Sequence, residues 1–128
     1  MTVFLPDTST LIDALNGKRN RKKLLRELVA QGHSLACCAV TIAELYAGLR
    51  PDEVARAAEL VSVLLWTETS FTLARKAGEL RYEWARKGKT LALPDVLIAA
   101  TALHYGLTLI TDNRKDFPMP ELNIHSLK

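Results

Sequence analysis

Four acidic side chains in this chain of 128 residues stand directly after predicted strands or near the starts of predicted helices. These acids are Asp7, Glu44, Asp95 and Asp112. In an open sheet of parallel strands, the functional site lies beyond the carboxyl ends of the strands. We therefore expect the four carboxylates to meet at one edge of one sheet.

Carboxylates that lie within a few ångströms of each other repel, so each one is destabilising unless its charge is neutralised. Protons can do this through raised pKa values, and divalent cations do it better. Hard oxygen ligands without a cluster of His or Cys favour Mg²⁺ or Mn²⁺ over zinc. Such a site indicates phosphoryl-transfer chemistry, in which one metal activates a water and a second, about 3.5–4 Å away, stabilises the leaving oxygen.

Each acid also has a purely structural interpretation. Asp7 could cap the helix that follows it. Glu44 is expected in the first turn of a helix that opens at Thr41, and this T-x-x-E spacing fits a capping box. Asp95 could be a first-turn acid favoured by the helix dipole, and Asp112 could belong to a turn. None of these interpretations explains why all four acids fall at the same edge.

The elements that must position these acids alternate between strands and helices. Short apolar runs predict strands at residues 3–5, 34–38, 65–67, 107–110 and near 123–125. Helical spacing and capping residues predict helices at residues 8–15, 19–31, 41–50, 51–64, 70–87 and 94–103. This order predicts a three-layer α/β/α fold around a mostly parallel sheet of four to five short strands. The length predicts one domain spanning residues 1–128.

The formal net charge of +3 conceals an uneven distribution. Residues 18–26 carry six bases and no acid, residues 75–89 carry six bases and two acids, and the remainder has five bases and 12 acids. This pattern excludes a uniformly basic protein, so a polyanion would have to bind locally. The candidates for contact with a phosphate backbone are Arg19, Lys22, Lys23, Arg86, Lys87 and Lys89. The alternative is that these cations form solvated helix faces.

Several simple features restrict the class of protein. No apolar run approaches the ~20 residues of a membrane span, and the N-terminal residues do not read as a signal peptide. Cys37 and Cys38 are adjacent in a predicted strand, so their side chains point to opposite faces and are poorly placed to bond each other. Free thiols fit a reducing cytoplasm. The three histidines are scattered, which argues against histidine-based acid–base catalysis.

Four segments together resemble the motifs of PIN domains. They are residues 7–12 (DTSTLI), 41–48 (TIAELYAG), 94–102 (PDVLIAATA) and 109–117 (LITDNRKDF). The order and spacing match over essentially the whole chain, and the length and the last segment are most similar to VapC-like toxin ribonucleases. The resemblance implies an Mg²⁺-dependent endoribonuclease toxin, with Mn²⁺ as a substitute, that inhibits translation or growth. It also implies a homodimer, a cognate antitoxin, and transfer or ribosomal RNA as the substrate.

The resemblance assigns the core catalytic and metal-binding carboxylates to Asp7, Glu44 and Asp95. The fourth contribution is expected from Asn113 and Asp116, which rank together ahead of Asp112. Asp112 would then belong to the metal shell or face the substrate.

Three hydroxyl groups, those of Thr8, Ser9 and Thr111, could lie near the metal or the phosphate, or could simply cap helices and turns. Two other functions stay open from the residues alone. One is a catalytically inactive PIN-like module that binds RNA or protein. The other, less favoured, is a phosphoacceptor switch of the receiver type. DNA also stays open as a substrate.

Overall fold

The computed structural model describes residues 1–125 and Leu127. In this part of the chain the strands are β1 Val3–Pro6, β2 Ser34–Cys38, β3 Leu65–Thr67, β4 Thr108–Ile110 and β5 Asn123–His125. The α-helices are α1 Thr8–Leu15, α2 Arg21–Ala30, α3 Ala39–Ala47, α4 Val54–Ser62, α5 Phe71–Arg86 and α6 Leu93–Tyr105. Two short 3₁₀ helices, η1 Pro51–Glu53 and η2 Arg114–Asp116, complete the set.

The five strands form one sheet in the order β3-β2-β1-β4-β5, and every neighbouring pair is parallel. From β1 the chain builds outward through β2 to β3, and then crosses back to add β4 and β5 on the other side. The order therefore reverses between β1 and β4, where Pro6 is in register with Ile110. A ligand site is expected in the crevice beyond the carboxyl ends of these two strands.

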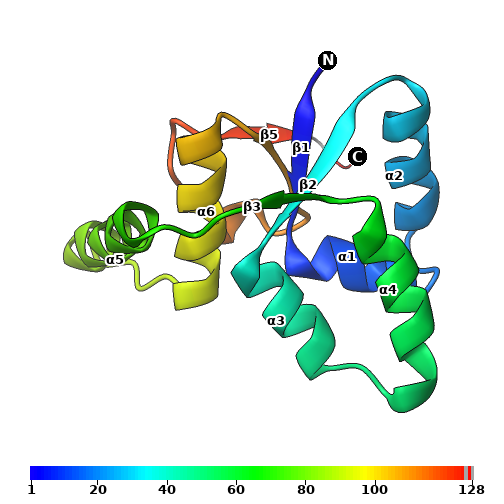
Figure 1. Cartoon of the computed structure of the whole chain (residues 1–128). Coiled ribbons are helices and arrows are strands. Elements are labelled where there is room, and N and C mark those ends of the chain that lie inside the picture. Colours follow the sequence, from blue (N-terminus) through cyan, green and yellow to red (C-terminus); the bar gives the residue numbers. More distant parts are fainter. Residues whose placement is uncertain (126, 128) are drawn as a thin grey trace.

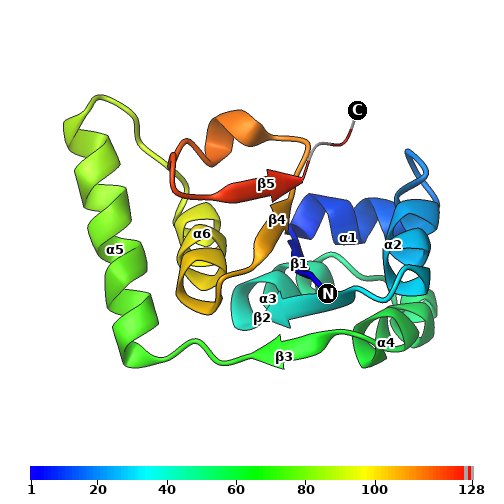
Figure 2. The ribbon, with the colours of Figure 1, turned by 90° about the horizontal axis from the view of Figure 1, so that it is seen from above.

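Helices cover both faces of the sheet, which confirms the predicted three-layer fold. Helices α5 and α6 lie on one side, and α1, α2 and α4 lie on the other (Figure 1). Figure 2 shows the sheet as the middle layer from above. Adjacent strand residues point to opposite faces, so Phe4 packs with α1 and α2 while Leu5 packs with α5 and α6. Helix α3 starts at the carboxyl edge and packs against both α1 and α6.

Three helix starts differ from the sequence prediction by two or more residues, and those of α5 and α6 differ by one. Helix α2 begins at Arg21 because Arg19 and Asn20 have positive φ values of 55° and 58°. The predicted helix 51–64 is divided into η1 and α4. Helix α3 begins at Ala39, two residues before the predicted start.

Thr41 is the reason for the early start of α3. Its hydroxyl accepts a hydrogen bond from the Cys38 amide at 3.2 Å and donates one to the Cys38 carbonyl at 2.9 Å. Thr41 is therefore the third residue of the helix and closes its first turn, while Cys38 is the N-cap. The T-x-x-E capping box predicted for Thr41 and Glu44 is wrong. The start of α3 matters because this helix carries Glu44.

Two predicted exclusions can be compared with the structure. Cys37 and Cys38 are buried free thiols, as predicted. No helix in residues 1–125 combines the length and the apolarity that crossing a membrane would require.

We expect the Thr41→Val substitution to lower the free energy of unfolding by about 1–2 kcal/mol, because it leaves the buried Cys38 amide without its acceptor. Chemical denaturation measures the change. The matched control is Thr72→Val at an exposed position of α5, which should stay within about 0.5 kcal/mol of wild type. Equal effects of the two substitutions would contradict the capping role of Thr41.

Candidate active site

Asp7 lies at the end of β1, where the strand order reverses, and is only 4% exposed. Its Oδ1 accepts hydrogen bonds from the Thr10 amide at 2.9 Å and the Thr10 hydroxyl at 2.6 Å. Its Oδ2 accepts from the Thr111 hydroxyl at 2.6 Å. Asp7 therefore caps α1, as one interpretation predicted, and is also fixed to the segment that follows β4. The carboxylate has a single well-defined orientation.

Glu44 projects from the second turn of α3, not from the first turn as the sequence suggested, because the helix begins at Ala39. Its Oε1 accepts a hydrogen bond of 2.6 Å from the Thr8 hydroxyl. Thr8 is the first residue of α1 and follows Asp7 directly. The contact therefore brings the side chain of Glu44 to the carboxyl end of β1.

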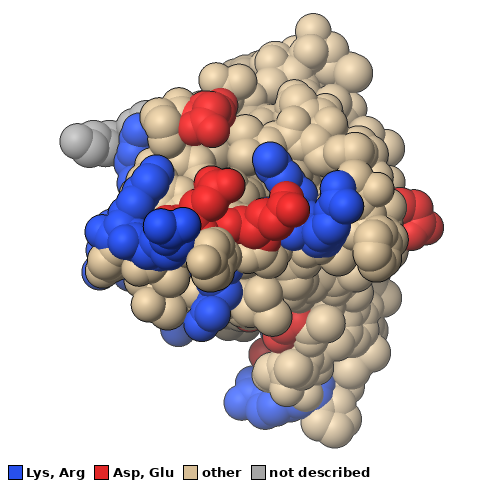
Figure 3. Space-filling view, turned by 90° about the vertical axis from the view of Figure 1, so that its left-hand side faces the viewer, with Lys and Arg blue, Asp and Glu red and all other residues tan. Residues whose placement is uncertain are grey.

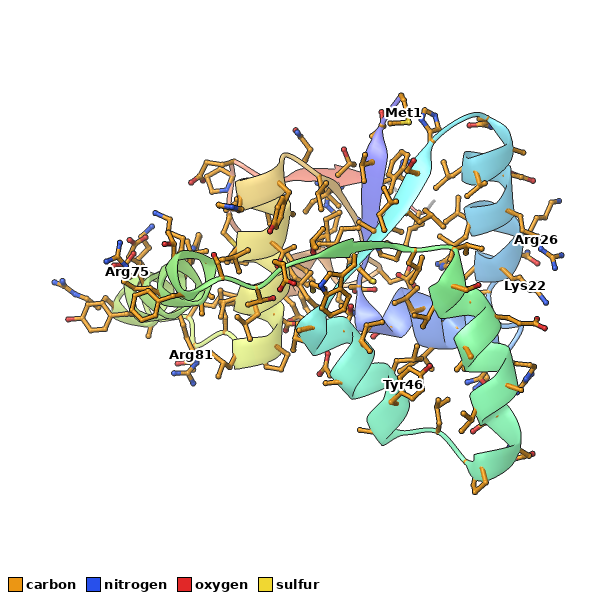
Figure 4. The ribbon with its side chains drawn as sticks, in the orientation of Figure 1. Met1, Lys22, Arg26, Tyr46, Arg75 and Arg81 are labelled. Atoms are coloured by element: carbon orange, nitrogen blue, oxygen red, sulfur yellow. The ribbon has the colours of Figure 1, made fainter. Side chains whose placement is uncertain are left out.

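Asp95 lies in the first turn of α6, as predicted, two residues after the helix begins. Burial raises the pKa of Asp95 from 3.8 to about 6, and the negative charges of Asp116, Glu44 and Asp7 add to the rise. Arg81 of α5 donates a 2.9 Å hydrogen bond to the Leu91 carbonyl and so braces the segment that leads into α6 (Figure 4). Elements far apart in the sequence thus hold these acids near each other.

We refer to Asp7, Glu44, Asp95 and Asp116 as the acid cluster. In the part of the chain that the structure describes, no lysine or arginine forms a salt bridge with any of them. Every side chain of the acid cluster offers hard carboxylate oxygens as metal ligands, so these residues fit Mg²⁺ or Mn²⁺ in kind and number. Within the described residues, no three Asp, Glu, His or Cys side chains are grouped tightly enough to hold a metal ion already.

Asp112 makes different contacts from the other acids. Its carboxylate pairs with the Arg21 guanidinium at 2.6 Å and with that of Arg19 at 3.4 Å. The backbone amide of Asn113 donates a 2.9 Å hydrogen bond to the Thr111 hydroxyl, and this hydroxyl itself donates to the carboxylate of Asp7. Among the three predicted candidates for the fourth position, this geometry favours Asp116 as the carboxylate and leaves Asn113 beside the cluster.

Thr10 is a site residue that the sequence analysis missed. It is fully buried and gives Asp7 two of its three hydrogen bonds. The spacing of Asp7 and Thr10 was the available signal, because an N-cap side chain bonds the amide of the third helical residue. Of the three hydroxyls that were proposed, Thr8 and Thr111 each contact a carboxylate of the cluster, whereas Ser9 is exposed.

The two basic segments differ in their surroundings. Arg19 is held by Asp112, while Lys22 and Lys23 project from the exposed side of α2. Figure 3 shows the outward face of α5, where acidic side chains lie between two groups of basic ones.

Cations at the end of α5 have local contacts. The Lys87 ammonium lies 4.5 Å from the centre of the Trp84 ring, and the Arg86 guanidinium lies 5.8 Å from that of Tyr82. Lys89 donates to the Lys115 carbonyl.

Comparisons with known proteins agree with this fold. The PIN domain family matches residues 4–119. Ribonuclease VapC19 of Mycobacterium tuberculosis is 34% identical over 119 residues, covering 92% of this chain and 95% of that protein. The structure of VapBC2 from Rickettsia felis, bound to a DNA fragment from its promoter, has a TM-score of 0.84 at 26% identity and covers 97% and 98% of the two chains. A toxin–antitoxin complex from Klebsiella pneumoniae has a TM-score of 0.78 at 29% identity and covers 100% and 98%.

We expect the raised pKa of Asp95 to make the metal-free protein less stable as the pH rises. The folded state binds this proton more tightly than the unfolded state, so its stabilising contribution is complete below about pH 3.8 and is lost as the pH rises through about 6. Asp95→Asn removes this titration. Above pH 6 and in EDTA, the variant should be more stable than wild type by about 1 kcal/mol, after allowance for solvent screening. Denaturation curves between pH 4 and 8 measure the difference, and a difference that does not change with pH would contradict the prediction.

Proposed function

The chain belongs to the PIN domain family, and from this premise we propose that it is an Mg²⁺- or Mn²⁺-dependent endoribonuclease that hydrolyses RNA phosphodiester bonds. The single observation that carries the proposal is the acid cluster, which lies at the reversal of strand order without a salt-bridge partner among the described residues. A group of carboxylates without protein cations suits a cation supplied by the solvent.

The residues of the site have separate tasks in this proposal. Asp7 is the fixed point, because three hydrogen bonds hold its carboxylate in one orientation. Glu44 comes from the second turn of α3, Asp95 comes from the first turn of α6, and Asp116 belongs to η2. These four carboxylates would hold the metal, with Asn113 beside them. Asp112 would belong to the outer metal shell or face the substrate. When bound there, a metal would supply charge neutralisation at the phosphate and a water of lowered pKa.

The biological role follows from the relatives. We infer that the protein is the toxin of a toxin–antitoxin pair, that a cognate antitoxin protein holds it inactive, and that its activity inhibits translation or growth. Support comes from relatives that are named VapC ribonucleases and from solved structures of toxin–antitoxin complexes that share the fold. We also propose a homodimer acting in the cytoplasm, with transfer or ribosomal RNA as the substrate class.

A catalytically inactive binding module is the alternative function. The geometry of this chain argues against it, because an inactive module has no need of three carboxylates around a half-buried Asp95 that add to the rise in its pKa. Measurements of metal binding and of RNA cleavage distinguish the two functions, because we expect both of the nuclease and neither of the inactive module.

We expect Asp95→Asn to reduce RNA cleavage to below about one thousandth of the wild-type rate, because the variant removes a charge from the cluster while α6 stays intact. Gel analysis of cleaved transfer and ribosomal RNA in Mg²⁺ measures the loss. The control is Asp52→Asn, which removes an exposed acid paired with Arg50 and should leave cleavage unchanged. Cleavage by wild type that persists undiminished in EDTA would refute the metal-dependent mechanism.

We expect Mg²⁺ or Mn²⁺ to stabilise the folded protein through the same cluster. At a free ion concentration of about 100 times the Kd, the free energy of unfolding should rise by about 2.7 kcal/mol. Calorimetric titration and thermal unfolding measure binding directly, without any RNA. Glu44→Gln and Asp95→Asn should weaken the effect, and Asp52→Asn should not. A wild-type protein that shows no binding of either ion would favour the inactive module.

A further inference from the structure

The corner between α1 and α2 contains a basic hollow of about 420 Å³, which we call the α2 hollow. Gly17 and Asn20 are among the residues that line it, and its basic side chains are Lys22, Lys23 and Arg26. The hollow also contains one acid, Glu27, which lies 3.9 Å from the Lys23 ammonium.

Two cations of the α2 hollow are available to a ligand. Lys22 and Arg26 are four residues apart, so they share one side of α2, and both project away from the body of the molecule (Figure 4). Neither has a salt-bridge partner within the described residues. The lining is cationic and lacks large apolar side chains, so the hollow suits an anionic backbone better than an apolar group.

The α2 hollow and the acid cluster lie at opposite ends of α1. Asp7 caps one end of α1 and Gly17 follows the other, and a helix of eight residues spans about 12 Å. The corner is also fixed from a second direction, because Arg21 binds Asp112 at 2.6 Å. Asp112 follows Thr111, whose hydroxyl donates to Asp7. The hollow and the acid cluster are therefore connected both by α1 and by the Arg21–Asp112 ion pair.

The backbone conformation at Arg19 and Asn20 allows the neighbouring arginines to contact Asp112. Arg19 and Asn20 both adopt left-handed conformations, which cost free energy in residues other than glycine. In this conformation the guanidinium groups on both sides of Asn20 reach the same carboxylate, that of Asp112.

We propose that the α2 hollow binds phosphate groups of the RNA strand a few nucleotides away from the bond that is cleaved. This inference rests on the proposed ribonuclease function. The acid cluster repels an RNA backbone, so the attraction must come from cations outside it, and the two exposed cations of the hollow beyond the far end of α1 supply it. The second basic segment is less suitable, because Glu79 and Glu83 fall among its cations in the sequence and Glu79 pairs with Arg75 at 3.9 Å.

The first test measures binding in a variant that does not cleave. Lys22→Gln with Arg26→Gln, made in the Asp95→Asn protein, is titrated with a fluorescein-labelled 12-nucleotide RNA of mixed sequence in EDTA. We expect an affinity loss of about tenfold and a salt slope that is smaller by about 1.4, since each phosphate contact to a single strand contributes about 0.7. The control is Arg75→Gln with Lys76→Gln on α5, which removes the same charge and should change the affinity less than about twofold.

The second test uses the active protein and substrate length. With a 12-nucleotide substrate, Lys22→Gln with Arg26→Gln should raise KM about tenfold and leave kcat unchanged. With a trinucleotide, which is too short to reach the hollow, the variant should match wild type. Circular dichroism and thermal unfolding confirm that each variant is folded.

Three results would overturn the inference. They are an equal loss of affinity in the α5 control, unchanged RNA binding by the α2 variant, and a loss confined to duplex DNA. The experiments also distinguish a failure of the proposed ribonuclease function from a failure of the proposed RNA binding in the α2 hollow. If wild type cleaves RNA but the α2 variant keeps its KM, the hollow has no role. If wild type cleaves no RNA but the variant still loses RNA affinity, the ribonuclease function fails and the hollow stands.

Discussion

The hydrogen bonds around Asp7 connect the parts of the molecule on which the site depends. The Asp7 amide donates to the Ile110 carbonyl at 2.9 Å and so continues the pairing of β1 with β4. The side chain caps α1 through Thr10 and reaches the segment after β4 through Thr111. Strand, helix and loop are thus positioned by one buried residue, Asp7, through its backbone amide and its carboxylate. The other acids are placed relative to this fixed point, Glu44 through Thr8 and Asp95 through the packing of α6.

This arrangement concentrates negative charge at the carboxyl edge of the sheet. Burial raises the free energy of an ionised Asp95, the like charges around it add to that cost, and the raised pKa of Asp95 reflects both. Two buried apolar clusters, one on each face of the sheet, provide stability that offsets this cost. Stability and site chemistry are therefore assigned to different regions of a small domain, the interior of the layers and the carboxyl edge of the strands.

Much of the fold and part of the site could be predicted from the sequence because their signals are local. Apolar runs separated by helical patterns predict the strands and the layers, and acids after strand ends predict the edge where Asp7 and Asp95 lie. The turn of α3 that carries Glu44 was mispredicted because Thr41 can close a helix start from the third position as well as from the cap. The pairing of Arg21 with Asp112 joins residues 91 positions apart, and no local pattern encodes it.

The strand order has a consequence for how the molecule is made. β1 needs β4 as its neighbour, and the Thr111–Asp7 hydrogen bond joins residues 104 positions apart. Contacts over such separations form late, because a long loop must close before they stabilise the chain. A growing polypeptide that ends before β4 has three of the four acids of the cluster but no edge on which to gather them. The growing chain therefore has no assembled site until β4 and the segment after it, with Thr111 and Asp116, have been added.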